Sequence, residues 1–322
     1  MDSNGSASSR LVTLNSLLKK SVNDLEKIHE AEAGLLGIQT GLPFVDNISR
    51  GLCKGDMTLI LPPYNCVPAT AEYASANILC DNIVSNCLVN DDVRGIYFCP
   101  GTDSVNLIKR MLSIQADLDF FKLKGLKSLD QEDWPRLSAG LTRMTSERFV
   151  FHNGNSLSIE NIRNAIDVVN KPNNPINMLV IRNLNVLLLH EAANSKSVGD
   201  VLNELSEIVA DTDCHLLLTM DNSPPENSVS GLSEQQTDYC SDVESHVNQV
   251  LSFKWKRYTH DYCLLQAAEI SIRKGPYTVP VDLTCLINSN SLKISDPNSA
   301  SDHGKEQWFE VYEEDYLESE CG

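Results

Sequence analysis

The sequence of 322 residues lacks several features that would place it in a membrane, a secretory pathway or a metal-binding class. No apolar run approaches the roughly 20 residues that span a bilayer, and the first ten residues, MDSNGSASSR, have no apolar centre like that of a secretory leader. The ten cysteines never form a Cys-x-x-Cys pair, and no His-x-x-x-His pair occurs, so the spacing typical of zinc sites is missing. We therefore expect a cytoplasmic protein with reduced thiols, no membrane insertion and no metal.

Basic residues are also scarce. The chain has 26 Lys and Arg against 44 Asp and Glu, which gives a formal net charge of -18. A surface of this charge repels phosphate backbones, because nucleic-acid binding depends on Lys and Arg that displace counterions. A basic protein or a metal ion fits this charge better than DNA does.

Short apolar segments alternate with amphipathic ones through most of the chain. Such alternation predicts βαβ units, that is, a mostly parallel sheet flanked by helices. The polar segment 222–245 is predicted to be a loop and a candidate for partner contacts. Three further segments joined by short turns predict an antiparallel edge at the C-terminal end of the sheet, so the expected fold class is α/β. The predicted strands are 57–61, 95–98, 149–151, 177–181, 215–219, 247–255, 263–272 and 279–287, and the predicted helices are 70–84, 104–118, 158–169 with Ser158 as N-cap, and 197–212.

Four parts are expected along the chain: a disordered N-terminus (1–9), an amphipathic linker helix (10–36), the α/β domain (37–295) and an acidic tail (296–322). The linker helix is predicted from apolar positions spaced three and four apart. The apolar stripe of this helix either contacts another subunit or packs on the domain of the same chain. The residues of the stripe include Leu11, Leu14, Leu18, Val22 and Leu25.

The tail combines acidic residues with interleaved aromatic ones and is predicted to be disordered. Two interpretations stay open, a docking peptide whose aromatic side chains insert into a partner and a solvating tail. The aromatic residues are Trp308, Phe309, Tyr312 and Tyr316.

One predicted strand, loop and helix has the layout of a phosphate-binding loop. The strand MTLIL (57–61) runs into PYNCVPAT (63–70), after which a helix is expected. The loop contains prolines where such loops carry glycines, and it has no lysine.

The region around this loop resembles the RecA-like motor domain of DnaB-type replicative helicases. The segment GIQTGLPFVDNISRGLCKGDMTLIL matches a family pattern that typically reads GIPTGF..LD..TGGL..G.LI.L. Further matches follow in order, among them GIYFCPGTDSVNLIKRMLS, LDQEDWPRLSAGLTRM, MLVIRNLNVL and AEISIRKGP, over residues 11 to 286. The resemblance implies a RecA-like (P-loop NTPase-type) fold. No counterpart of the helicase N-terminal domain is recognised.

The resemblance also implies a degenerate phosphate loop. Pro63 and Pro68 stand at the two glycine positions, and Ala69 stands at the lysine, so that only Thr70 of the magnesium-hydroxyl position is kept. Each proline removes an N–H donor and fixes φ near -65°. The expected loop therefore has fewer donors for phosphate and no cation.

The other positions that the family uses for ATP hydrolysis differ in the same way. Gly101 aligns with the catalytic glutamate, and Arg182 aligns with the acidic Walker B residue that holds magnesium. Met220 replaces a polar sensor, and of a Lys-x-Arg pair that reaches the neighbouring subunit's nucleotide only Arg273 is kept, as a lone surface arginine. The resemblance thus predicts a site without the residues for hydrolysis.

DNA binding in the channel of a ring is disfavoured by charge. Between Ser197 and Phe253 there are eleven Asp or Glu and no Lys or Arg, and Tyr239 is the one aromatic residue between these two. Single-stranded DNA needs cations along its path and stacking aromatic side chains.

The sequence therefore predicts a catalytically inactive pseudo-ATPase that needs no cofactor and serves as a structural or adaptor subunit of a larger assembly. Its partners would be proteins, including a homo-oligomer or a helicase-like ring. The alternatives are a replication accessory factor that binds or regulates a helicase or DNA, and a subunit that binds nucleotide without hydrolysing it. Fold inheritance by itself does not decide among them.

Overall fold

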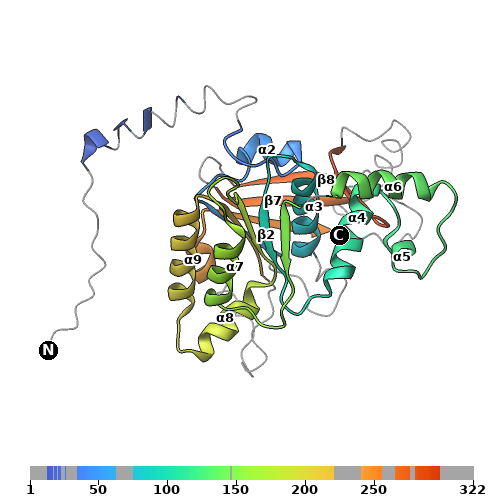
Figure 1. Cartoon of the computed structure of the whole chain (residues 1–322). Helices are drawn as coiled ribbons and strands as arrows, with labels where there is room; N and C mark the ends of the chain where they lie inside the picture. Colours follow the sequence, from blue (N-terminus) through green and yellow to red (C-terminus); the bar gives the residue numbers. More distant parts are fainter. Residues whose placement is uncertain are drawn as a thin grey trace, which may run out of the picture.

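One nine-stranded sheet organises the part of the chain that the structure describes (Figure 1). This computed structural model describes residues 13–16, 18, 19, 21, 22, 26, 35–62, 75–145, 147–220, 241–255, 265–275 and 280–297. The strand order is β3-β2-β4-β5-β1-β6-β7-β8-β9. The strands are β1 (Met57–Leu61), β2 (Gly95–Phe98), β3 (Phe149–His152), β4 (Met178–Ile181), β5 (His215–Thr219), β6 (Gln249–Trp255), β7 (Leu265–Lys274), β8 (Val281–Asn288) and β9 (Ile294–Ser295).

The predicted mixed sheet is confirmed. Strands β1 to β6 are joined by parallel pairings, and β7, β8 and β9 follow β6 in order, each antiparallel to the strand before it. Strands β1, β2, β4 and β5 are buried along their whole length, as expected of parallel strands covered on both faces. Strands β1, β2 and β5 have the predicted bounds, and the others differ by one or two residues.

Helices cover both faces of the sheet and enclose two apolar cores. Helices α7 (Ile159–Val169), α8 (Leu184–Ala193) and α9 (Val198–Thr212) lie on one face, and α3 (Ser75–Val89) and α4 (Ser104–Ala116) lie on the other (Figure 1). Side chains of α3 and α4 share a buried cluster with Ile60 and Tyr97, whereas those of α7, α8 and α9 pack with Leu59 and Phe98. The two clusters alternate along β1 and β2 because successive strand residues point to opposite faces.

Several elements were missed by the sequence prediction. These are the helices α2 (Pro43–Ser49), α5 (Phe120–Leu123), α6 (Asp133–Met144) and α8, and the short strand β9. Helix α8 is apolar on most sides and follows β4 after two residues, so it gives no helical periodicity that could be read. Helix α2 lies in a segment predicted as turns, and it begins with Pro43, which suits a first helical position.

Helix boundaries agree where a capping residue marks them. Ser158 caps α7 as predicted: its hydroxyl accepts from the Asn161 amide, and the Asn161 side chain accepts from the Ser158 amide. The predicted helix 70–84 is wrong at its C-terminal end, because α3 continues to Val89. The polar loop predicted for 222–245 is wrong in its last part, where residues 241–246 are helical.

The two ends of the chain are described only in part. Leu14, Leu18 and Val22 of the predicted linker helix are in helical conformation and exposed to solvent. Leu11 and Leu25 lie outside the described residues, as do Trp308, Phe309, Tyr312 and Tyr316 of the tail.

Candidate functional site

The carboxyl ends of the parallel strands bring three of the predicted site residues to one edge of the sheet. Arg182 follows β4, Met220 follows β5, and Gly101 lies in the turn after β2. The Arg182 amide donates to the Phe98 carbonyl (2.8 Å), and the Met220 amide donates to the Ile60 carbonyl (3.2 Å), which ties the ends of neighbouring strands together. Ligands of open α/β sheets bind at this edge. The four predicted loop residues, Pro63, Pro68, Ala69 and Thr70, follow β1 in the sequence but lie outside the described residues.

Arg182 is buried and forms an ion pair. Its Nη1 lies 2.5 Å from Oδ1 of Asp81, which comes from the middle of α3 and has no exposed side-chain surface. The same Nη1 donates to the Tyr97 hydroxyl (3.1 Å). Arg110 of α4 reaches the other carboxylate oxygen of Asp81 (3.1 Å), so one carboxylate holds two guanidinium groups.

The electrostatics of this cluster keep Arg182 charged. Burial by itself lowers the pKa of the Arg182 guanidinium, but the neighbouring Asp81 and Tyr97 more than compensate, and the pKa lies above its usual value. Burial raises the pKa of Tyr97 well above its usual range, so its hydroxyl stays protonated. The position that the resemblance assigns to a magnesium carboxylate thus holds a permanent cation whose own counter-ion is within the protein.

The polar groups near the end of β5 are hydrogen-bonded to one another. The Thr219 hydroxyl donates to Oδ1 of Asn77 in α3 (3.2 Å) and accepts from the amide of Asn183 (3.0 Å). Met220, which the resemblance aligns with a polar sensor, is fully buried in the apolar cluster beneath α7, α8 and α9. The Met220 thioether carries neither a transferable proton nor a charge, so it cannot act as a polar sensor does.

The turn that follows β2 carries no carboxylate at the predicted position. Gly101 is exposed and has φ +66°, and a Cβ at this residue would meet no atom within 4 Å. The Gly101 amide donates to the carbonyl of Gly154 (3.2 Å), which joins this turn to the one after β3.

Arg273 does not fit the prediction of a lone surface arginine. It lies in β7, partly buried, and its Nη1 is 3.6 Å from Oε1 of Glu244. Glu244 belongs to the helical segment 241–246, which was predicted to be part of a loop, and this contact could not be foreseen from the sequence.

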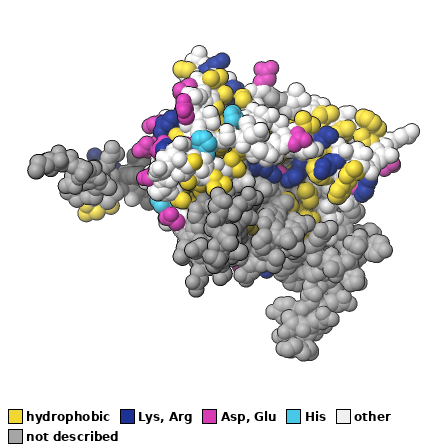
Figure 2. Space-filling model, turned by 90° about the horizontal axis from the view of Figure 1, so that it is seen from below, with side chains coloured by type: hydrophobic (Ala, Val, Ile, Leu, Met, Phe, Trp, Pro, Cys, Tyr) yellow, Lys and Arg dark blue, Asp and Glu magenta, His cyan; other side chains and the backbone are white. Residues whose placement is uncertain are grey.

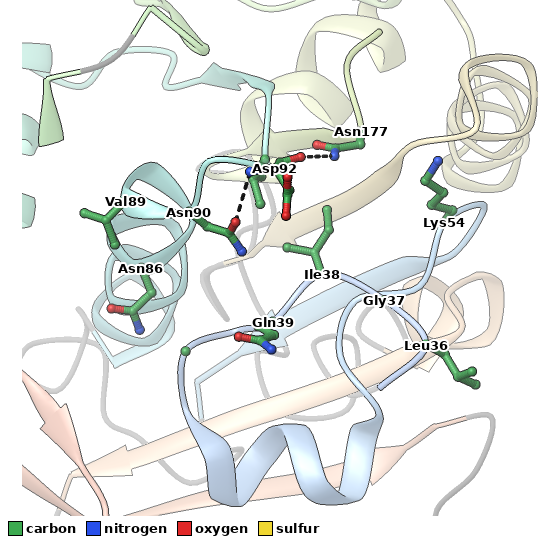
Figure 3. Close-up of a pocket in the computed structure, with 12 residues that line it drawn as sticks. Leu36, Gly37, Ile38, Gln39, Lys54, Asn86, Val89, Asn90, Asp92 and Asn177 are labelled. Atoms are coloured by element: carbon green, nitrogen blue, oxygen red, sulfur yellow. Dashed lines mark hydrogen bonds between the residues drawn. The ribbon is translucent and has the colours of Figure 1, made fainter. Parts of the chain in front are cut away.

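A groove of about 730 Å³ lies at the opposite, amino-terminal edge of the sheet (Figure 3). Its polar side chains bond mainly within the protein: Asn177 donates to the Asp92 carbonyl, Asn90 accepts from the Asp92 amide, and Asn86 donates to the Thr40 carbonyl. Lys54 pairs with Asp213. The groove residues precede the parallel strands, whereas the predicted nucleotide site follows them. The length of the strands therefore separates the groove from that site.

The remaining chemistry of the described ranges is limited. No three His, Cys, Asp or Glu side chains in them are arranged so that they could hold a metal ion. The thiols of Cys53, Cys80, Cys87, Cys99, Cys214 and Cys285 are free. Among the helices of the described ranges, none has the length and apolar character to cross a membrane.

Asp81 is the site residue that sequence reasoning missed. A signal was present, because Asp81 stands alone in the apolar run ANILCDNIV, and acidic residues are rarely buried without a partner. Its partner Arg182 is 101 residues away along the chain, so the pairing itself follows only from the fold.

The fold and the strand order define a RecA-like α/β protein, as comparison with solved structures shows. The chain is similar to a solved ATPase domain (TM-score 0.66, 13% identity, 88% of this chain and 98% of that one). It is also similar to a DnaB-like replicative helicase described with its interactions with primase (TM-score 0.65, 14% identity, 90% and 68%). A KaiC-like protein, PH0186 of Pyrococcus horikoshii, aligns with a TM-score of 0.50 at 15% identity over 80% of this chain and 97% of that one.

The chain belongs to the family of the DnaB-like helicase C terminal domain, whose family model matches residues 37–220. It is therefore a protein related to replicative helicases. A probable replicative DNA helicase of Trieres chinensis is 25% identical to it over 182 residues, which are 56% of this chain and 37% of the relative. The chain thus spans little more than a third of that relative's length.

Proposed function

We propose that this protein is a catalytically inactive member of its family, a pseudo-ATPase that acts as a structural or adaptor subunit of a protein assembly. The observation that carries the proposal is the buried ion pair of Arg182 with Asp81. Magnesium bound to ATP is held by anionic or neutral oxygen ligands, and a guanidinium group repels it.

The phosphate loop supports the same proposal through its composition. Pro63 and Pro68 have no N–H group to donate to a phosphate, and Ala69 offers no charge where the family has a lysine. Gly101 likewise provides no carboxylate to orient an attacking water. Loss at several separate points of one reaction lowers both binding and turnover.

Assembly is the property that this proposal retains. The apolar stripe of the linker helix needs a surface to cover it, and Leu14, Leu18 and Val22 are exposed in the single chain. We propose that it contacts a neighbouring subunit, either a second copy or a helicase-like ring. The segment 222–245 and the tail 296–322 are further candidates for contacts with partner proteins.

Isothermal titration of the full chain with ATP and magnesium tests the proposal, with an active member of the family as the positive control. We expect no heat of binding up to millimolar ATP and no phosphate release. Micromolar binding with turnover contradicts the proposal. Micromolar binding without turnover supports instead a subunit that holds nucleotide as a structural ligand.

A second candidate function is that of a replication accessory factor, which the family membership favours. Such a factor would bind or regulate a replicative helicase. Affinity purification from the source cells, with the full chain and with a chain lacking residues 296–322, separates the two. Recovery of helicase peptides favours the accessory factor, and recovery of an unrelated complex favours the adaptor.

A further inference from the structure

The segment that contains α5 and α6 has an unusual number of large apolar side chains in contact with solvent. Phe121, Leu126, Trp134 and Leu141 are 47%, 70%, 56% and 49% exposed, and we call the surface that they form with their basic neighbours the α5–α6 face. Trp134 and Leu141 are seven residues apart in α6 and therefore lie on one side of the helix, away from its buried Gly140. Exposed apolar side chains in such number mark an interaction surface.

The α5–α6 face carries cations among its apolar side chains although the protein is acidic. Residues 117–144 contain five Lys or Arg and five Asp or Glu, in a chain of net charge -18. Lys122, Lys127 and Arg136 form ion pairs within this segment, whereas Lys124 and Arg143 have no ion-pair partner among the described residues. Lys124 lies over the ring of Phe120 (5.2 Å) and Lys127 over the ring of Phe121 (5.6 Å), so cations and apolar groups alternate. Figure 2 shows hydrophobic and basic side chains together at the end of the molecule that carries α5.

We propose that the acidic, aromatic tail of the same chain, residues 296–322, binds the α5–α6 face. The tail contains nine Asp or Glu and one Lys, a net charge of -8, and it supplies Trp308, Phe309, Tyr312 and Tyr316. Its composition complements the face on both counts. Aromatic side chains bury apolar surface and stack on cations, and the carboxylates can pair with Lys124 and Arg143.

The tail begins close to the α5–α6 face. Just before β9, the Ser291 hydroxyl donates to Oδ1 of Asp117 (2.8 Å), and the Phe120 amide donates to the carbonyl of Asn290 (3.0 Å). Asn288 also donates to Asp117 (3.2 Å). The strand from which the tail departs is thus fixed to the junction between α4 and α5.

The length of the tail suffices for the contact. Trp308 follows Asp296 by 12 positions, and a chain of this length reaches up to roughly 40 Å when extended. Helix α6, with 12 residues, is about 18 Å long. Binding within one chain therefore needs no rearrangement of the sheet, and a short tether gives an effective concentration of about 1 mM.

This inference goes beyond the pseudo-ATPase function and does not depend on it. The bound tail covers the exposed apolar side chains of the α5–α6 face, so that a partner of this face or of the tail has to displace the intramolecular contact. With an intrinsic Kd of about 100 µM, the bound form would exceed the open form about tenfold.

Hydrogen exchange of the full chain, read by mass spectrometry over residues 121–132, tests the proposal. We expect the combined variant Trp308→Ser, Phe309→Ser, Tyr312→Ser and Tyr316→Ser to raise exchange there about tenfold, and 0.5 M salt to raise it in the parent chain. Trp134→Ser, or Lys124→Glu with Lys127→Glu, should have the same effect, and adding the tail variant to either should change little more.

Matched controls exist on the other face of the molecule. Val168 of α7 is 75% exposed and Lys171 is exposed after that helix, so Val168→Ser and Lys171→Glu should leave exchange at 121–132 unchanged. Circular dichroism of each variant verifies that the domain stays folded.

Three results would overturn the proposal. Exchange that is unaffected by the tail variant means that the tail does not bind there. Protection that grows with protein concentration means that the occupant comes from a second copy. Exchange that rises in Leu14→Ser, Leu18→Ser and Val22→Ser but not in the tail variant means that the linker helix covers the face.

Discussion

The Nη1 atom of Arg182 lies 2.5 Å from Oδ1 of Asp81 and joins the end of β4 to the middle of α3. Both side chains are buried, so each charge depends on the other for its compensation. Asp81→Asn should lower the free energy of unfolding by about 3–5 kcal/mol, because it leaves a buried guanidinium without a carboxylate. Urea titration measures this change.

The double variant Asp81→Leu with Arg182→Met should recover most of the lost stability, because the buried guanidinium is removed together with its carboxylate. Arg110, the second partner of Asp81, is partly exposed and can be solvated by water. Asp91→Asn is the matched control. Asp91 pairs with Arg148 at an exposed position, so its loss should cost about 1 kcal/mol or less. Equal losses in the free energy of unfolding for Asp81→Asn and Asp91→Asn would show that the buried pair stabilises the fold no more than an exposed one.

His215 should make the fold less stable as the pH falls from 7.5 to 5. Burial lowers the pKa of His215 to about 4, and its Nδ1 lies 2.7 Å from the Cys53 carbonyl. The unfolded chain takes up a proton near pH 6.5 while the folded chain stays neutral, so stability is present above that pH and is lost below it. The loss over this interval is about 2 kcal/mol.

Urea titration of the parent chain and of His215→Gln at both pH values isolates this contribution. The carboxyl groups of Glu191 and Asp200 have a lowered pKa and change little in this interval. The difference between parent and variant should shrink at pH 5. An identical pH dependence in the two proteins would rule out the neutral, buried His215.

The N-cap of α7 offers a local test of the fold. Ser158→Ala removes the hydroxyl that accepts from the Asn161 amide (3.1 Å) and should lower the free energy of unfolding by about 1 kcal/mol. Ser158→Asp keeps an acceptor at the helix N-terminus and should restore most of it. Thermal unfolding of the three proteins, followed by circular dichroism, gives the ranking, and a loss in Ser158→Asp equal to that in Ser158→Ala would contradict it.

The linker helix should govern assembly. Replacing Leu14, Leu18 and Val22 by serine removes the described part of its apolar stripe, and we expect the mass of the purified particle to fall to that of the single chain. Native mass spectrometry measures it, and Val168→Ser serves as control because it removes an exposed apolar side chain elsewhere. An assembly of unchanged mass in the triple variant would assign the contact to another surface.

The sequence by itself determined the sheet and its regular helices. The apolar strands 57–61, 95–98 and 215–219 could be placed because a buried parallel strand is a short apolar run between turns, and Ser158 could be placed because capping acts within one helical turn. The order of the motifs also indicated the family, since those matches depend on residues near in sequence.

Only the tertiary structure decided what surrounds Arg182 and where Arg273 points. The partner of Arg182 is Asp81, in a different element 101 residues away, and that of Arg273 is Glu244, in a helix that sequence patterns did not reveal. Helix α8 was missed for a different reason. It is apolar on most of its sides, so its sequence shows no helical alternation of apolar and polar residues. Contacts between segments distant in the sequence form only when the sheet and its helices pack together. Patterns of neighbouring residues therefore do not predict them.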